Sequence, residues 1–239
     1  MSQRKYNFVE GEFYHIYNRG TDKRTIFQDL DDYQRFQMLL YVANDTKSIN
    51  VRDLMRAEIN PYERTRMSPL VAIGAYCLMP NHYHVLITPL QEGGASLFFQ
   101  KLSTSYSMYF NKKYERTGTL FEGKFKSQLA DDDRYLKYIF SYIHLNPVKL
   151  LQPDWKEVGI KDKDRAAQYL KKYTFSSYKE AIGEVRRESS IVESKLFPNY
   201  FENFEHAERE IQEWLSFSPS LSSPPECARR RPTPPSAPS

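Results

Sequence analysis

The sequence predicts a fold that combines β-strands with α-helices, of the α+β class. Two apolar runs, residues 71–78 and 82–88, are separated by Pro80 and Asn81, which is typical of two strands joined by a tight turn. Apolar residues recur at helical spacing in three longer segments of the chain. The 239 residues are enough for one core with appended segments, or for two small domains.

The periodicity of apolar residues predicts each element in turn. The predicted strands cover residues 13–18, 71–78, 82–88 and 124–129, and the predicted helices cover residues 29–42, 96–113, 131–146, 164–172 and 204–215. Residues 44–69 are polar and aperiodic, so we expect an irregular insertion with at most one short helix near residues 51–57, and we assign it no role. The resulting organisation is a main domain of residues 1–150, a helical extension of residues 151–215 and a disordered, Pro- and Ser-rich tail of residues 216–239.

The composition is typical of a soluble protein of the cytoplasm. Charged residues make up 27% of the chain, and no apolar run reaches the ~18 residues that a membrane span needs, so we expect no membrane partner and no signal peptide. Cys77 lies in an apolar run and Cys227 in the tail, so we expect no disulfide. The net charge of +4 permits nucleic-acid binding without requiring it.

Two histidines stand two residues apart at the start of the second apolar run. Because strand side chains alternate between faces, His82 and His84 point to the same face, close enough to share a divalent metal. Neutral imidazole is a common metal ligand, but such a pair can equally well form ordinary hydrogen bonds at a sheet edge. His15, on the first predicted strand, could approach this pair or could be a hydrogen-bonded residue of the sheet.

A tyrosine and an asparagine lie one turn apart near the end of the predicted helix at residues 131–146. Tyr142 and Asn146 are four residues apart and are therefore neighbours on that helix. A metal held by His82 and His84 would need a third ligand, an oxygen, which the amide of Asn146 could supply. The Tyr142 oxygen could then attack a phosphodiester as a covalent nucleophile. For any one of the 18 tyrosines, the alternative is a packed ring with a hydrogen-bonded hydroxyl.

The predicted strand at residues 124–129 is basic. Its alternating pattern would place Lys124, Lys126 and Gln128 on one face. Lysines on a strand can protect a sheet edge from aggregation, or they can contact a phosphate backbone.

Taken together, these segments resemble the HUH single-tyrosine transposases, and most closely the branch of REP-associated tyrosine transposases. The resemblance covers about residues 8–183, and its specificity comes from the His-x-His pair together with the Tyr-x-x-x-Asn-Pro motif. The matching segments are residues 14–20 (YHIYNRG), 79–86 (MPNHYHVL), 118–127 (GTLFEGKFKS), 138–148 (YIFSYIHLNPV) and 173–178 (YTFSSY).

The resemblance implies a ferredoxin-like domain, in which an antiparallel sheet carries the two histidines on a central strand and helices pack on one face. It implies that His82, His84 and Asn146 bind Mg²⁺ or Mn²⁺ and that Tyr142 is the nucleophile. Related insertion-sequence enzymes usually have Gln where this chain has Asn146, which points to the REP-associated branch. The implied substrate is single-stranded DNA with hairpins, REP-like or at transposon ends. The resemblance also implies that cleavage leaves a 5′-phosphotyrosine and a free 3′-hydroxyl, and that the protein is a monomer or a homodimer.

Four basic residues are the expected contacts to DNA phosphates: Arg19, Arg116, Lys124 and Lys126. Two other functions stay open. One is a catalytically silent protein derived from a transposase, which binds hairpin DNA as a regulator; the intact histidine, tyrosine and asparagine set argues against it. The other is an RNA-binding module that stacks bases on aromatic residues of the sheet, which has no use for the histidine pair.

Overall fold

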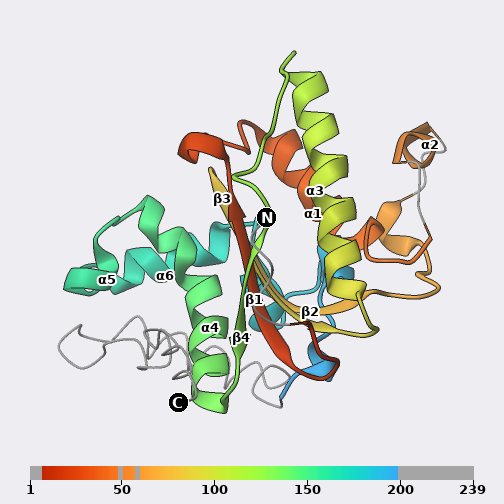
Figure 1. The fold of residues 1–239 in the computed structure, drawn as a ribbon. Coiled ribbons are helices and arrows are strands. Elements are labelled where there is room, and N and C mark those ends of the chain that lie inside the picture. Colours follow the sequence, from red (N-terminus) through yellow and green to blue (C-terminus); the bar gives the residue numbers. More distant parts are fainter. Residues whose placement is uncertain (1–6, 48–50, 57–59, 199–239) are drawn as a thin grey trace, which may run out of the picture.

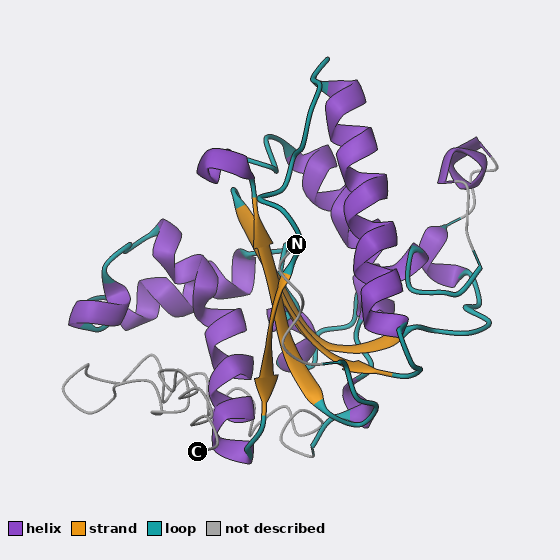
Figure 2. Ribbon diagram, in the orientation of Figure 1, coloured by secondary structure: helices purple, strands orange, loops and turns teal. Residues whose placement is uncertain are grey.

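The computed structural model of the chain describes residues 7–47, 51–56 and 60–198. Four antiparallel strands form one sheet in the order β2-β3-β1-β4 (Figure 2). The strands are β1 (Phe13–Arg19), β2 (Val71–Met79), β3 (His82–Pro89) and β4 (Lys126–Ala130). The α+β prediction is confirmed, and the two histidines lie on an inner strand, as expected.

The hairpin of β2 and β3 turns at Pro80 and Asn81, and the chain after β1 holds that turn in place. The Gly20 amide donates to the Asn81 carbonyl at 2.9 Å, and the Ile26 amide donates to the Pro80 carbonyl at 2.8 Å. In the sheet, Arg19 is paired with His82 and Tyr17 with His84. The histidine pair therefore lies where the end of β1 meets the start of β3.

Helices α1 (Leu30–Val42) and α3 (Gly94–Lys113) pack on one face of the sheet (Figure 1). The Asp29 side chain accepts a hydrogen bond from the Asp32 amide and so caps the start of α1. The apolar side chains of both helices meet the sheet residues that alternate onto this face, among them Ile16, Tyr83 and Val85. This layer matches the helices expected on one face.

The opposite face of the sheet is covered as well, by α4 (Asp133–Leu145) and the residues that follow it. The later helices are α5 (Trp155–Val158), α6 (Lys163–Lys172) and α7 (Tyr178–Ala181). Cys77 and Leu86 of the sheet share a second apolar core with Ile139 of α4 and Leu170 of α6. Strand β2 is consequently buried along its whole length, in keeping with its unbroken apolar sequence.

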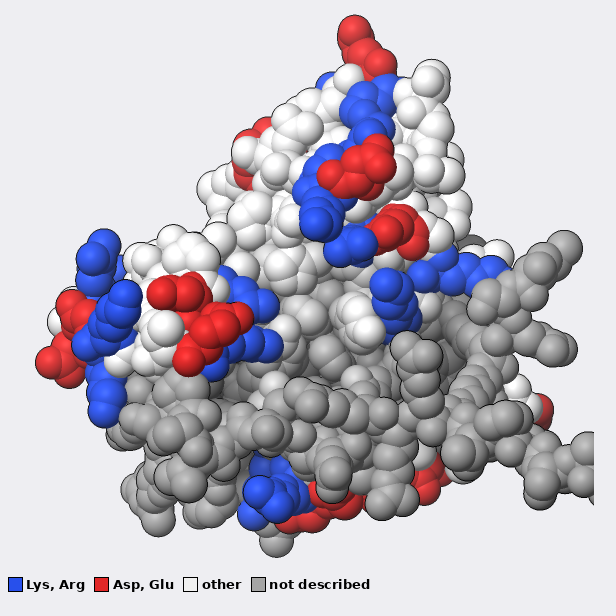
Figure 3. All heavy atoms as spheres, turned by 60° about the vertical axis from the view of Figure 1, so that its left-hand side comes forward, with Lys and Arg blue, Asp and Glu red and all other residues white. Residues whose placement is uncertain are grey.

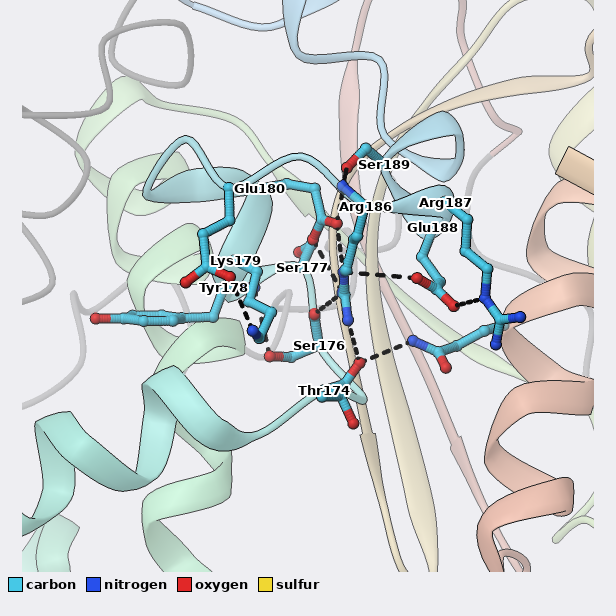
Figure 4. Close-up of polar contacts among 12 residues, drawn as sticks. Thr174, Ser176, Ser177, Tyr178, Lys179, Glu180, Arg186, Arg187, Glu188 and Ser189 are labelled. Atoms are coloured by element: carbon cyan, nitrogen blue, oxygen red, sulfur yellow. Dashed lines mark hydrogen bonds and ion pairs between the residues drawn. The ribbon is translucent and has the colours of Figure 1, made fainter. Parts of the chain in front are cut away.

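Arg186 fastens the end of the helical extension to the edge of the sheet (Figure 4). Its guanidinium donates to the Thr174 carbonyl at 2.6 Å, to the Tyr76 hydroxyl at 3.1 Å and to the Glu180 carboxylate at 2.6 Å. Beside it, the Leu78 amide of β2 donates to the Phe175 carbonyl at 2.9 Å. The extension is thus bonded to β2 through backbone and side chain.

The remaining predictions concern short or peripheral segments. The insertion contains the expected short helix, α2 (Val51–Arg56). One-turn or slightly longer 3-10 segments occur at Thr21–Lys23, Pro61–Glu63, Asn146–Leu150, Arg187–Ile191 and Ser194–Leu196. The predicted helix at residues 204–215 and the tail at 216–239 lie outside the described residues, and the division at residue 150 stays a prediction. No helix in the described part of the chain is long and apolar enough to cross a membrane.

Candidate active site

His82 and His84 lie on the same face of β3, with ring centroids 5.0 Å apart. That face is the one covered by α4, because the alternation that turns Tyr83 and Val85 toward α1 and α3 turns the histidines the other way. The shared face that strand geometry predicts is therefore present.

Each histidine has one ring nitrogen engaged and the other available. The Asn81 amide nitrogen donates to the Lys23 carbonyl at 3.2 Å, so its Oδ1 faces His82 and accepts from Nδ1 at 2.6 Å. His84 Nδ1 and His15 Nε2 are 2.8 Å apart, whereas His84 Nε2 is buried with no partner among the described residues. With Nδ1 protonated on both rings, both Nε2 lone pairs are free to bind a metal.

All of these histidines are held in the neutral form by burial. Desolvation lowers the pKa of His82 to about 4 and that of His15 to about 3, and the nearby Lys149 and Lys156, respectively, lower them further. Burial also lowers the pKa of His84 well below its usual value. A neutral imidazole is the form that binds a metal, so the site is ready for one at neutral pH.

Tyr142 and Asn146 come from the last turn of α4 and its C-cap. The Tyr142 ring lies 5.4 Å from the His84 ring, centroid to centroid, in an edge-to-face arrangement. The Asn146 Nδ2 donates to the Tyr142 carbonyl at 3.2 Å, while its Oδ1 is buried and has no partner among the described residues. Burial raises the pKa of Tyr142, and contact with the Asn146 side chain opposes that rise.

The donors at this site fit a divalent metal. His84 Nε2 and Asn146 Oδ1 are buried polar atoms without partners in the described structure, which is costly unless a ligand satisfies them. Within the described residues, no group of three His, Cys, Asp or Glu side chains could hold a metal. A site at this position would therefore combine two imidazole nitrogens with the amide oxygen of Asn146.

A cavity of about 330 Å³ opens beside the histidines and Tyr142. It is lined by Tyr17, Asn18, Arg19, Lys23, Asn81, His82, His84, Glu122, Lys126 and Tyr142. Two of the four expected phosphate contacts, Arg19 and Lys126, are thus at the site. Arg19 is paired with Glu122, its Nη2 donating to the carboxylate at 3.0 Å, so part of its charge is already balanced.

The other two expected contacts lie elsewhere, and the predicted face shared by Lys124 and Lys126 is wrong. Gly123 has a φ of +72°, and β4 begins only at Lys126, so the alternation does not extend back to Lys124. Lys124 instead lines a second cavity of about 1090 Å³ between α3 and residues 118–125. Arg116 packs over the Phe110 ring and donates to Asn111 Oδ1 at 3.2 Å.

Two lysines at the site were missed by the sequence reasoning. The Lys156 ammonium lies 3.8 Å from the centroid of the Tyr142 ring, and the Lys149 ammonium lies 5.5 Å from it. Lys149 follows Asn146 by three residues, so its place just after the end of the helix could have indicated that it lies near the site. Lys156 comes from α5 in the extension, and no sequence spacing relates it to Tyr142.

An inner strand with two neutral histidines, facing a helix with a tyrosine and an asparagine, is the arrangement expected of the HUH single-tyrosine class. Residues 62–146 match the family model described as "Transposase IS200 like". His82, His84, Tyr142 and Asn146 all fall within the matched residues.

The remaining comparisons concern curated proteins and solved structures. No curated protein matches the chain significantly. The chain is similar to the solved structure of a REP-associated tyrosine transposase bound to a REP hairpin, with a TM-score of 0.46 and 13% sequence identity. That similarity covers 79% of this chain and 90% of the other.

Proposed function

We propose that this protein cleaves and rejoins single-stranded DNA next to a hairpin, and that Tyr142 carries the DNA as a covalent intermediate. One observation carries the proposal: the ring centroids of Tyr142 and His84 are 5.4 Å apart. Beside them, His84 Nε2 and Asn146 Oδ1 are buried and have no partner among the described residues. A structural tyrosine would not need such a neighbourhood.

In this proposal the Tyr142 oxygen attacks the phosphorus of a phosphodiester. The bond from phosphorus to the 3′ oxygen breaks, so the downstream fragment stays on tyrosine through its 5′-phosphate and the upstream fragment ends in a free 3′-hydroxyl. The raised pKa of Tyr142 keeps the phenol protonated at neutral pH, so its proton passes to solvent as the new bond forms. The leaving 3′ oxygen takes up a proton from solvent.

His82, His84 and Asn146 would hold the metal, which when bound supplies a Lewis acid and orients the phosphate. Imidazole is a softer ligand than Mg²⁺ prefers, so of the two expected ions Mn²⁺ suits this set better. The chain's own part is to keep both imidazoles neutral by burial and to orient them through hydrogen bonds with Asn81 and His15.

Arg19 and Lys126 would contact the DNA backbone at the cavity, and Arg116 and Lys124 would contact it farther from the cleaved bond. On the face shown in Figure 3, basic side chains gather in separate groups, most of them interleaved with acidic side chains. Among the described residues in this view, the distribution suits phosphate contacts at a few defined positions better than a broad, nonspecific electrostatic surface.

The test is the covalent adduct itself. Hairpin oligonucleotides with randomised single-stranded flanks, labelled at the 3′ end, are incubated with the protein and Mn²⁺ and separated under denaturing conditions. We expect labelled protein that disappears with EDTA and in the His82→Ala and His84→Ala variants, which should still bind the hairpins. Tight hairpin binding by the intact protein with no adduct would favour the silent regulator instead.

A further inference from the structure

We propose that Lys149 and Lys156 together bind the phosphodiester that Tyr142 attacks, so that the helical extension completes the active site. The inference rests on the proposed function, because it names the substrate contact of the same site. We call the pair the lysine clamp, meaning these two residues only.

The two lysines approach one ring from two different elements. Lys149 belongs to the 3-10 segment Asn146–Leu150 that continues α4, and Lys156 belongs to α5. Their ammonium groups lie 5.5 Å and 3.8 Å from the Tyr142 ring centroid. Positive charge therefore converges on the candidate nucleophile from two directions in the chain.

Neither ammonium forms an ion pair with a carboxylate of the described residues, although the Glu157 carboxylate lies near enough to raise the pKa of both lysines against the lowering by burial. Other lysines do find such partners: Lys113 lies 2.9 Å from Asp32, and Lys179 lies 2.8 Å from Glu184. Desolvation and repulsion from Lys149 lower the pKa of Lys156 to about 8, although Lys156 keeps an exposed surface. Two like charges held together and only partly balanced by Glu157 favour binding of an anion.

The position of Lys156 is set by its neighbours and does not depend on the lysine side chain. Trp155 is buried in the second core with residues of the sheet. The Gln152 side chain donates to the Gly159 carbonyl at 2.7 Å and accepts from the Lys161 amide at 3.0 Å, which closes the loop around α5. A pre-positioned ammonium loses little freedom when it binds a phosphate.

The lysine clamp would stabilise the negative charge of the phosphodiester during attack by Tyr142. A phosphodiester carries one negative charge, and attack by tyrosine spreads that charge over its nonbridging oxygens. His82 and His84 lie on β3 and Asn146 lies at the end of α4, while the clamp adds positive charge at the Tyr142 ring. In the absence of DNA the ring face holds the ammonium by a cation–π contact, which a phosphate oxygen can replace.

The test is protection of the lysines from acetylation in the full chain. The protein is treated with an amine-acetylating reagent in the presence and absence of a 20-residue oligothymidylate at low salt, and each lysine is followed by mass spectrometry. Phosphate contacts do not depend on base sequence, so this probe is sufficient. We expect acetylation of Lys149 and Lys156 to fall several-fold with the oligonucleotide, in the intact protein and in Tyr142→Phe, while Lys172 at the end of α6 is unaffected.

Variants give the second arm. Lys149→Ala and Lys156→Ala should each reduce the slope of log affinity against log salt by about 0.7, the value for one single-strand phosphate contact. Lys156→Arg should retain the slope, and Lys172→Ala is the matched control. Unchanged slopes and no protection would overturn the clamp, as would failure of the oligonucleotide to bind. If the DNA adduct forms but Lys149 and Lys156 are not protected, the proposed function stands and the clamp is wrong. If both lysines are protected but no adduct forms, the clamp stands and the proposed function is wrong.

Discussion

His15 shows how much of the site depends on a single hydrogen bond. Its Nε2 lies 2.8 Å from His84 Nδ1, and both residues are buried. The sequence left open whether His15 approaches the histidine pair, and the structure shows that it contacts His84. A partner on Nδ1 selects the tautomer of His84 and aims its other nitrogen.

The first prediction concerns this hydrogen bond. His15→Ala removes the partner of His84 Nδ1, so Mn²⁺ affinity should fall about 10- to 100-fold, the usual cost of losing a group that orients a metal ligand. His15→Gln, whose amide can restore a hydrogen bond, should recover part of the loss. Mn²⁺ binding is measured by calorimetry or by electron paramagnetic resonance, with His82→Ala as the reference for a lost ligand. Undiminished affinity in His15→Ala would remove His15 from the site.

The second prediction separates Tyr142 from its neighbour. Tyr138 stacks on Tyr142 with ring centroids 5.9 Å apart and an interplanar angle of 9°, so it is a closely matched control. Tyr142→Phe should abolish the DNA adduct and change the free energy of unfolding by less than about 1 kcal/mol, because the ring stays. Tyr138→Phe and Tyr135→Phe should keep the adduct. A DNA label mapped to Tyr138 would overturn the assignment of the nucleophile and of Asn146 together.

Individual elements differ in how well the sequence predicts them. The hairpin of β2 and β3, with α1, α3 and α4, follows from local periodicity, and so does the pairing of Tyr142 with Asn146. The start of β4 was placed two residues too early, because alternation alone does not reveal that the backbone turns at Gly123. The contact of His15 with His84 depends on pairing between strands 69 residues apart, and Lys156 depends on the packing of the extension; neither leaves a local signal.

The third prediction tests how the extension is attached. Arg186 is largely buried and bonds several carbonyl and carboxylate oxygens, so Arg186→Gln should lower the free energy of unfolding by about 3 kcal/mol. Arg187, with 57% of its side chain exposed and Glu188 as its one ion-pair partner among the described residues, is the matched control. Arg187→Gln should stay within about 0.5 kcal/mol. Urea unfolding measures both, and equal effects of the two variants would mean that Arg186 does not anchor the extension.

At the scale of the whole molecule, the sheet lies between two helical layers and most described histidines are buried with it. Three of them, His15, His84 and His144, are inaccessible to solvent or nearly so. Burial lowers the pKa of His144 to about 3, as it does for His15. The same packing that keeps the candidate site neutral therefore makes the fold sensitive to acid.

The fourth prediction is the direction of that sensitivity. Above pH 6.5 these histidines are neutral in both folded and unfolded chains, so their burial does not make the free energy of unfolding depend on pH. As the pH falls below 6.5 the unfolded chain takes up protons that the folded chain does not, until the pH nears the folded pKa of about 3 to 4. Each buried histidine should lower the free energy of unfolding by up to ~1.4 kcal/mol per pH unit over that range.

Urea titrations at pH 7.5, 6.5, 5.5 and 4.5 measure this loss. Carboxylates with lowered pKa values, such as Asp45, begin to contribute only as the pH falls below about 5, so the interval from pH 6.5 to 5.5 reports the histidines alone. His144→Gln should reduce the slope of the free energy of unfolding against pH, between pH 6.5 and 4.5, by the equivalent of about one bound proton. A slope of zero in the intact protein would show that the buried histidines take up protons in the folded state.

The closeness of Tyr142 to His84 within one chain has a consequence for mixtures of defective proteins. Some enzymes build each active site from residues of two subunits. Two inactive variants of such an enzyme can regain activity when they are mixed, because one subunit of each kind together supplies a complete site. Here the strand and the helix that meet at the site come from the same polypeptide. Combining His84→Ala with Tyr142→Phe should therefore fail to restore the adduct at any ratio or concentration. Recovery to about a quarter or half of normal would reveal exchange of α4 between two copies of the protein.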